Sequence, residues 1–323
     1  MRRDVRGRAA GAALAAVLLP AAAAGCVGGS AVVDGLPDTL RVGVLPGASA
    51  DAQRDRYAPL GRHLADRLGV EVALVVAADY PDAVEALTAG RVDVAQLGAL
   101  TYVRAAARSA DVAPLVTEVD EETGTPRTVA AVVVPNSSPH RTVRDVVAAG
   151  GTFAFGDPQS TAGALYPRKL LTEAGARCAA APGGCPPLAG VTYTGTHEAT
   201  AEAVLDGAAD AGGLALPALR RLERQGTVPA GALRVVGRAE VVGGPWVARA
   251  GLEASARTAV REAFTGIRDR ELLSSLGARS YAPVSAADYA PVREQAARPG
   301  AVDGAAEGGG PAGSPPAPAA APV

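Results

Sequence analysis

The feature that most constrains the fold is an alternation of short apolar runs with segments of helical periodicity. Leu40–Leu45 is an apolar run that ends at a Pro-Gly pair. From 57 to 68 the apolar residues recur at the spacing of one helix face, and Val70–Val76 is again a short apolar run. Strand, helix and strand in this order predict a mostly parallel sheet with helices on both faces.

A second series of the same kind begins after the apolar run Val129–Val134. Its strand candidates are Thr152–Phe155, Val191–Tyr193, Ala209–Gly212 and Leu233–Val236, separated by helices near 142–148, 161–175, 197–206 and 216–224. A closing segment starts at Pro245 and continues into helices near 254–265 and 268–275. Two such series predict two lobes: lobe 1 over 35–130, lobe 2 over 131–240, and a return to lobe 1 over 241–292. Strands near 128–134 and 237–248 are the predicted crossovers and hinge.

The first residues combine a basic cluster with an uncharged run from Ala9 to Gly25, which is typical of a secretory signal peptide over 1–25. The run ends at Cys26 after small residues, as in a lipobox, where the cysteine is acylated and becomes the new N-terminus. Ala23 stands where a lipobox usually has leucine, so ordinary cleavage after Ala22–Ala24 is the alternative. We expect an exported protein, anchored by lipid to the outer face of the membrane or periplasmic.

The other end, 293–323, is mostly Gly, Pro and Ala and has few side chains that could build a core. Such a composition predicts a disordered tail. The segment between the two ends is longer than one simple core requires, which agrees with two lobes.

The net charge of −2 predicts no basic face for nucleic acid. We find no cluster with metal-ligand spacing and expect neither a metal nor a cofactor. Of the three cysteines, Cys178 and Cys185 are separated by a turn-rich loop. In an exported protein this spacing predicts a local disulfide.

The stretch Phe155–Pro167 is the first candidate for chemistry. A strand ends, a tight turn follows, and Ser160 and Thr161 stand where a helix starts. The first turn of a helix carries unpaired N–H groups and a partial positive charge, and the small residues Ala162 and Gly163 allow an anion to approach them. The alternative is that Ser160 or Thr161 only caps the helix.

His197 lies at a second predicted junction between a strand and a helix. This location favours a contact with a ligand in the same cleft. We interpret His63 and His140, which lack such a location, as surface or core residues.

These motifs resemble the phosphonate, phosphate and phosphite-binding proteins of ABC importers. The likeness runs in order from about Leu40 to Tyr289 and rests on these segments: Ala78-Asp79-Tyr80, Val92-Asp-Val-Ala95, Gly98 to Tyr102, Gly156-Asp-Pro-Gln-Ser-Thr-Ala-Gly163, Tyr166-Pro167, Gly195-Thr-His-Glu198, Ala203-Val204, Asp210 and Gly243-Gly-Pro-Trp-Val247. The resemblance implies a two-lobed, type II periplasmic-binding-protein-like fold. It also implies a monomer that closes its lobes on a small oxyanion and serves a permease and its ATPase.

Position by position, the anion-binding hydroxyls of the family fall on Ser160 and Thr161, and a third falls on Ala162, which has no hydroxyl. The histidine contact falls on His197. The two cleft tyrosines fall on Tyr80 and near Thr128, which keeps a hydroxyl.

Members that bind aminoalkyl phosphonates supply two carboxylates, which correspond to Pro217 and Gly244. Because neither residue holds a cation, the resemblance favours phosphate, phosphite or a phosphonate with a neutral substituent.

Other functions are weaker interpretations of the same residues. Ser160, His197 and Asp210 suggest a hydrolase, but no Gly-x-Ser-x-Gly turn surrounds Ser160. The Gly-rich turn also lacks the Gly-Lys-Ser/Thr ending of a nucleotide-binding loop. We therefore do not expect an enzyme. A solute-binding protein for a sulfonate, nitrate or a pyrimidine precursor, and a ligand-sensing module, remain the alternatives.

Overall fold

The structure is a computed structural model that describes residues 34–301. The predicted signal peptide, Cys26 and the tail beyond 301 lie outside the described residues. Both sheets of the structure belong to one compact unit that starts at Val32. We call the residues around the six-stranded sheet (34–120 and 245–301) the first lobe, and those around the five-stranded sheet (127–242) the second lobe.

The sheet of the first lobe is mixed, and four of its six strands, β1 to β4, run in one direction. The return strand β10 pairs antiparallel with β3 and β4, and β11 pairs antiparallel with β4. In order across the sheet the strands are β11 (Ala278–Pro283), β4 (Ala113–Asp120), β10 (Pro245–Ala248), β3 (Val94–Gln96), β1 (Thr39–Val44) and β2 (Glu71–Val76).

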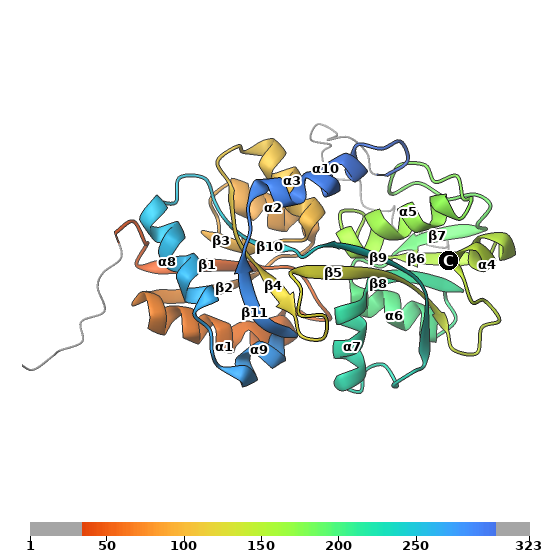
Figure 1. Ribbon diagram of the computed structural model, residues 1–323, viewed down its shortest axis with the longest axis horizontal. Coiled ribbons are helices and arrows are strands. Elements are labelled where there is room, and N and C mark those ends of the chain that lie inside the picture. Colours follow the sequence, from red (N-terminus) through yellow and green to blue (C-terminus); the bar gives the residue numbers. More distant parts are fainter. Residues whose placement is uncertain (1–33, 302–323) are drawn as a thin grey trace, which may run out of the picture. The chain divides into compact units, whose positions relative to one another are not determined.

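Helices cover both faces of this sheet (Figure 1). The central strand β10 shows why: Trp246 and Ala248 pack into one apolar cluster while Val247 packs into the other. Successive side chains of a strand point to opposite faces, so a strand buried on both sides carries a continuous apolar run. One face is covered by α1 (Ala50–Leu68), α8 (Ala254–Thr265) and α9 (Arg270–Leu276), and the other by α2 (Tyr80–Thr88), α3 (Ala99–Arg108) and α10 (Ala290–Ala296), which follows the short 3₁₀ turn Ala286–Tyr289.

The second lobe repeats this plan with four of five strands in one direction. In β5, Ala131 and Val133 pack against α6 and α7, while Val132 and Val134 pack against α4 and α5. Across the sheet lie β7 (Gly190–Tyr193), β6 (Thr152–Phe155), β8 (Ala211–Ala215), β5 (Arg127–Pro135) and β9 (Leu233–Val242); the helices are α4 (Val143–Ala149), the π-turn η1 (Thr161–Leu165), α5 (Tyr166–Glu173), α6 (His197–Leu205) and α7 (Leu216–Arg224).

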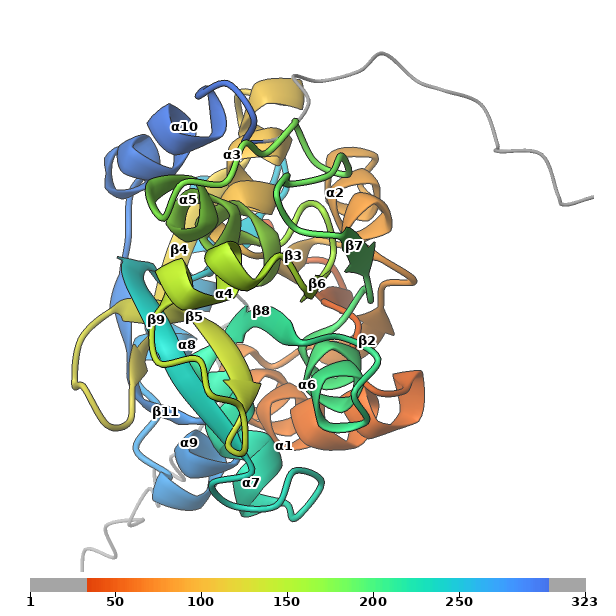
Figure 2. The same cartoon turned by 90° about the vertical axis from the view of Figure 1, so that its right-hand side faces the viewer.

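The chain passes twice between the lobes, after β4 and after β9 (Figure 2). The strand that enters each sheet, β5 or β10, is inserted between strands of that sheet. The two-lobed α/β fold with mostly parallel strands is therefore as predicted. The predicted boundary at 131 lies inside β5, because β5 pairs with β9 along its whole length from Arg127.

The predicted start of the tail at 293 is too early. α10 extends to Ala296, and Ala301 beyond it is buried. Val292 on this helix is also fully buried in the core of the first lobe, which a composition-based prediction does not detect.

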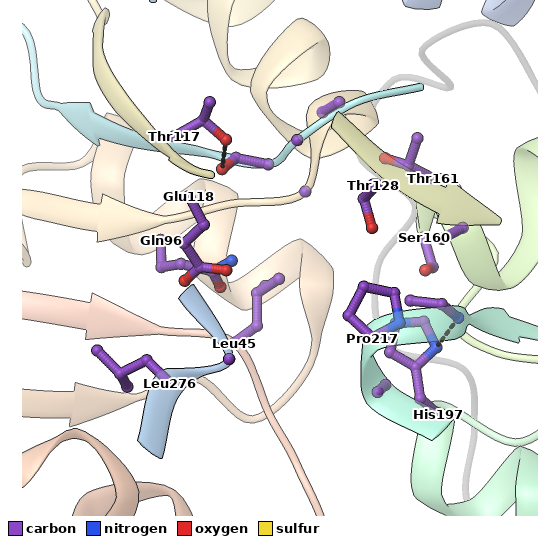
Figure 3. Close-up of a pocket in the computed structure, with 18 of the residues that line it drawn as sticks. Leu45, Gln96, Thr117, Glu118, Thr128, Ser160, Thr161, His197, Pro217 and Leu276 are labelled. Carbon is purple, nitrogen blue, oxygen red and sulfur yellow. Dashed lines mark hydrogen bonds between the residues drawn. The ribbon is translucent and has the colours of Figure 1, made fainter. Parts of the chain in front are cut away.

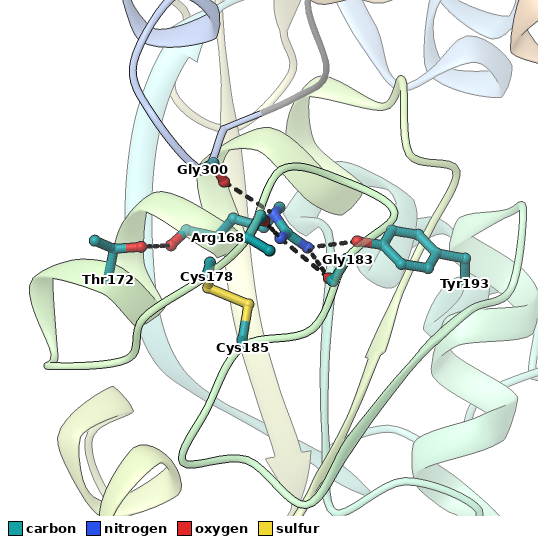
Figure 4. The surroundings of a disulfide bond; sticks show 8 residues. Arg168, Thr172, Cys178, Gly183, Cys185, Tyr193 and Gly300 are labelled. Atoms are coloured by element: carbon teal, nitrogen blue, oxygen red, sulfur yellow. Dashed lines mark hydrogen bonds between the residues drawn. A yellow bond between two sulfur atoms is a disulfide. The ribbon is translucent and has the colours of Figure 1, made fainter.

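The loop after α5 is held by one buried arginine (Figure 4). Cys178 and Cys185 form a disulfide in the structure. The guanidinium of Arg168 donates to the carbonyl of Gly183 at 3.1 Å inside this loop, and to the carbonyl of Gly300 at 3.4 Å. Arg168 thereby ties the disulfide loop of the second lobe to the segment that follows α10.

Candidate functional site

A cavity of about 200 Å³ lies between the lobes, and both lobes line it (Figure 3). Six of the seven residues that we predicted for ligand binding line this cavity: Tyr80, Thr128, Ser160, Thr161, Ala162 and His197. Gly163 does not line it. The structure therefore brings together residues that are far apart in sequence, on four different elements or their ends.

Ser160 both caps a helix and faces the cavity. It follows β6 and precedes η1, and its Oγ accepts a hydrogen bond from the N–H of Gly163 at 3.0 Å. The N–H of Gly156 donates to the carbonyl of Gly163 at 3.0 Å, which closes the loop. A Cβ on Gly163 would lie 2.9 Å from Ser160 Oγ, so only glycine fits there.

Thr161 joins the two lobes. Its Oγ1 accepts a hydrogen bond of 2.8 Å from the N–H of Leu100, in the first turn of α3. The hydroxyl hydrogen of Thr161 remains available for donation. Ala162 contributes only its backbone and methyl group to the cavity wall.

Tyr80 approaches the same place from the first lobe, as the first residue of α2. A hydrogen bond joins its side chain to Ser160, and burial raises the pKa of the Tyr80 phenol well above its ordinary value. The phenol is therefore a neutral donor or acceptor. Thr128 on β5 presents a second hydroxyl to the cavity (Figure 3).

His197 is the first residue of α6, and its ring lines the cavity. Nδ1 accepts a hydrogen bond of 3.4 Å from the N–H of Ala215. Burial lowers the pKa of His197, and the charge of Glu198 opposes this effect. The ring is therefore neutral near pH 7, and the geometry puts its remaining hydrogen on Nε2.

The sequence analysis missed a set of charged and amide side chains on the cavity wall, namely Arg56, Gln96, Glu118, Asp120, Glu198 and Arg221. Glu198 and Arg221 form an ion pair within the second lobe. Asp120 faces Arg220 across the lobes at 3.8 Å. The available signal was a pair of acidic residues inside the apolar run 113–120, which becomes β4.

Pro217 and Gly244 also line the cavity. A Cβ on Gly244 would lie 2.3 Å from the carbonyl oxygen of Leu97, so this backbone position excludes any side chain without a shift. Neither position offers a charge to a ligand.

The residues of the hydrolase alternative do not meet. Asp210 accepts hydrogen bonds from the N–H and hydroxyl of Thr152, at 2.7 and 2.8 Å. Thr152 begins β6, whereas Ser160 follows the end of that strand. Across 34–301 no three His, Cys, Asp or Glu side chains gather as metal ligands would. None of the helices in this part of the chain has the length and apolar character that a membrane crossing requires.

The chain matches the family described as "ABC transporter, phosphonate, periplasmic substrate-binding protein" over residues 42–289. The phosphate-import protein PhnD of Mycolicibacterium smegmatis is 28% identical over 239 residues, which are 72% of this chain and 74% of that protein.

Two solved structures share the fold, each with a TM-score of 0.70 and 20% identity. One is a binding protein component of an ABC phosphonate transporter from Pseudomonas aeruginosa; the match covers 80% of this chain and 85% of that one. The other is PhnD1 from Prochlorococcus marinus in complex with methylphosphonate, with 81% and 98% covered. These likenesses confirm the predicted two-lobed fold.

Proposed function

The chain belongs to the family of periplasmic phosphonate-binding proteins of ABC transporters, and from this premise we propose that it captures a small phosphorus oxyanion outside the cytoplasm. The loaded protein delivers this oxyanion to an ABC permease driven by its ATPase. The protein acts as a monomer and carries out no chemistry on the ligand.

One observation carries the proposal. The starts of η1 and α6 in the second lobe and of α2 and α3 in the first lobe meet at one cavity. Ser160, Thr161 and His197 offer hydrogen-bond donors there, next to backbone N–H groups that a helix leaves unpaired in its first turn. Such helix starts bind anions of phosphate size without a lysine.

The residues at the cavity wall favour phosphate, phosphite or a phosphonate with a neutral substituent. Pro217 and Gly244 are uncharged and line the cavity. The resemblance to the family assigns to these two positions the carboxylates of members that bind aminoalkyl ligands. The relative from Mycolicibacterium smegmatis is named a phosphate importer, and PhnD1 holds methylphosphonate. Both ligands share the oxyanion that the helix starts would bind.

Capture works by lobe closure. Contacts from both lobes to one anion favour the closed form, and the ligand shifts the equilibrium only by its higher affinity for that form. The crossovers after β4 and β9 serve as the hinge, and Tyr80 from the first lobe meets the hydroxyls of the second across the ligand.

The mature protein is held at the outer face of the membrane through lipid on Cys26. Residues 1–25 are removed during export. A multiply acylated cysteine anchors firmly, whereas a single chain binds a membrane only marginally.

The test is a thermal-shift screen of the purified mature domain against phosphate, phosphite, methylphosphonate, aminoethylphosphonate and sulfate. We expect stabilisation by at least one phosphorus oxyanion and its loss in Thr161→Ala, because that variant lacks the hydroxyl. Thr161→Ser keeps the hydroxyl and should keep the stabilisation. Absence of a shift with every phosphorus oxyanion, or phosphoester turnover that Ser160→Ala abolishes, contradicts the proposal.

A further inference from the structure

Three carboxylates line the cavity, and one of them has no partner. Glu198 is paired with Arg221. Asp120 accepts hydrogen bonds from two backbone N–H groups, at 3.1 and 2.8 Å, and faces Arg220. Within 34–301, no hydrogen bond or ion pair engages the carboxylate of Glu118.

Glu118 lies on β4 of the first lobe, where it is opposite Tyr281 of β11. Its carboxylate faces the cavity from the wall opposite Ser160 and His197 (Figure 3). The cavity thus has a wall of hydrogen-bond donors on one lobe and an acceptor on the other.

The environment makes an unpaired charge at this position costly. Burial raises the pKa of the Glu118 carboxyl, and the nearby charges of Arg56 and Arg221 only partly oppose this effect. A half-buried carboxylate without a partner is unfavourable, and an ionised carboxylate can only accept hydrogen bonds. A ligand that fits this wall therefore brings a hydrogen-bond donor.

We propose that Glu118 accepts the hydrogen of a P–OH group of the bound oxyanion, so that the cavity selects protonated phosphorus oxyanions and rejects sulfate. Near neutral pH phosphate carries one or two P–OH groups, and phosphite and alkylphosphonates still exist partly with one, whereas sulfate has no proton to donate. Sulfate would place its charge against the carboxylate and leave it unpaired. This inference rests on the proposed function, since lobe closure brings the wall of the first lobe to an anion held by the second.

The experiment compares titration calorimetry of inorganic phosphate and of sulfate on the full mature domain and on three variants. Glu118→Gln has the same shape but can donate to an unprotonated oxygen. We expect the preference for phosphate over sulfate to fall about 10- to 100-fold in this variant, because a hydrogen bond to a charged group is replaced. Glu118→Asp keeps the carboxylate and should still reject sulfate.

Glu121→Gln is the matched control. It removes the same charge three positions away, from an exposed side chain that accepts a hydrogen bond from the hydroxyl of Ser274 and does not line the cavity. This control should keep the wild-type preference. Thermal unfolding of each variant checks that the fold is retained.

Two outcomes overturn the inference alone. The first is an unchanged preference for phosphate over sulfate in Glu118→Gln. The second is that wild type binds aminoethylphosphonate more tightly than ethylphosphonate and that Glu118→Gln loses this preference. That result would show that the carboxylate binds an ammonium group of the ligand. If the wild-type domain binds no phosphorus oxyanion at all, the proposed function fails and this inference with it.

Discussion

Every side chain that we predicted to contact the anion is neutral. Ser160, Thr161, Thr128 and Tyr80 offer hydroxyls, and burial keeps His197 unprotonated. The attraction that these predicted residues offer an anion therefore comes from oriented dipoles and hydrogen bonds at helix starts. Such a site discriminates by the geometry and protonation of the ligand more than by its net charge.

Replacement of His197 tests this idea for a single donor. We expect His197→Ala to weaken binding of the preferred phosphorus oxyanion about tenfold or more, because hydrogen bonds to charged groups contribute about 1.5–3 kcal/mol. Burial lowers the pKa of His197, so the ring stays neutral in this range. The ratio of the wild-type affinity to the affinity of His197→Ala should therefore stay constant between about pH 6 and 8. Titration calorimetry at several pH values measures both quantities.

His140→Ala is the control, because His140 does not line the cavity. A wild-type affinity that rises on acidification while that of His197→Ala stays flat would show that the ring binds as a cation and would refute the neutral-donor role.

The donors on the second lobe were predictable from the sequence, and Glu118 was not. Ser160 and His197 stand where an apolar strand is followed by a helix. In a sheet of mostly parallel strands, such junctions lie close together at one edge of the sheet. The importance of Glu118 depends on which face of β4 it occupies and on the second lobe opposite, neither of which a linear pattern specifies. The restriction to glycine at 244 likewise comes from a carbonyl that is distant in sequence, that of Leu97.

At the scale of elements, the role of Ser160 as the cap of η1 can be separated from its proposed role in ligand binding. Ser160→Ala removes a hydroxyl that accepts from Gly163, and Thr142→Ala removes one that accepts from Asp145 at the start of α4, away from the cavity. We expect each to destabilise the protein by about 1 kcal/mol. Only Ser160→Ala should also lose affinity for the oxyanion.

Denaturant unfolding and calorimetry on both variants measure the two effects. Equal affinity in Ser160→Ala and in wild type would reduce Ser160 to a helix cap.

Elements with strong local signals were predicted well, and those that depend on distant partners were not. β6 and α8 have the predicted bounds, because each is a clear apolar or periodic run between turns. The crossover strand predicted near 237–248 is instead divided between the end of β9 and β10. α3, β4, β11 and α10 were not predicted as elements. β4 begins with Ala113-Pro114 and carries two acidic residues, so its pattern is weak, and its strand state depends on pairing with β10 and β11.

At the scale of the whole molecule, polar contacts join the lobes at several places apart from the two crossovers. Thr161 accepts from Leu100, and Arg220 lies 3.8 Å from Asp120. Asp157 of the second lobe accepts from the backbone N–H of Tyr80 in the first. Such contacts set how the stability of the folded protein responds to solution conditions.

Asp157 gives this response a definite sign. Burial raises the pKa of its carboxyl to about 6, above the value of 3.8 that it has in an unfolded chain. Between these two values the folded protein holds a proton that the unfolded chain has released. Its contribution to stability is therefore complete below about pH 4 and is lost as the pH rises through about 6.

The side chain of Asp157→Asn does not titrate. Near pH 4 we accordingly expect this variant to unfold at the same denaturant concentration as wild type, or at a lower one. At pH 7.5 the free energy of unfolding of this variant should exceed that of wild type by about 1–3 kcal/mol. Asp145→Asn is the control of opposite sign, because hydrogen bonds from Arg141 and Thr142 lower the pKa of Asp145. That variant should lose stability at pH 7.5, and its difference from wild type should shrink as the pH falls. A difference between Asp157→Asn and wild type that does not change with pH would show that the carboxyl is not the titrating group at the contact between the lobes.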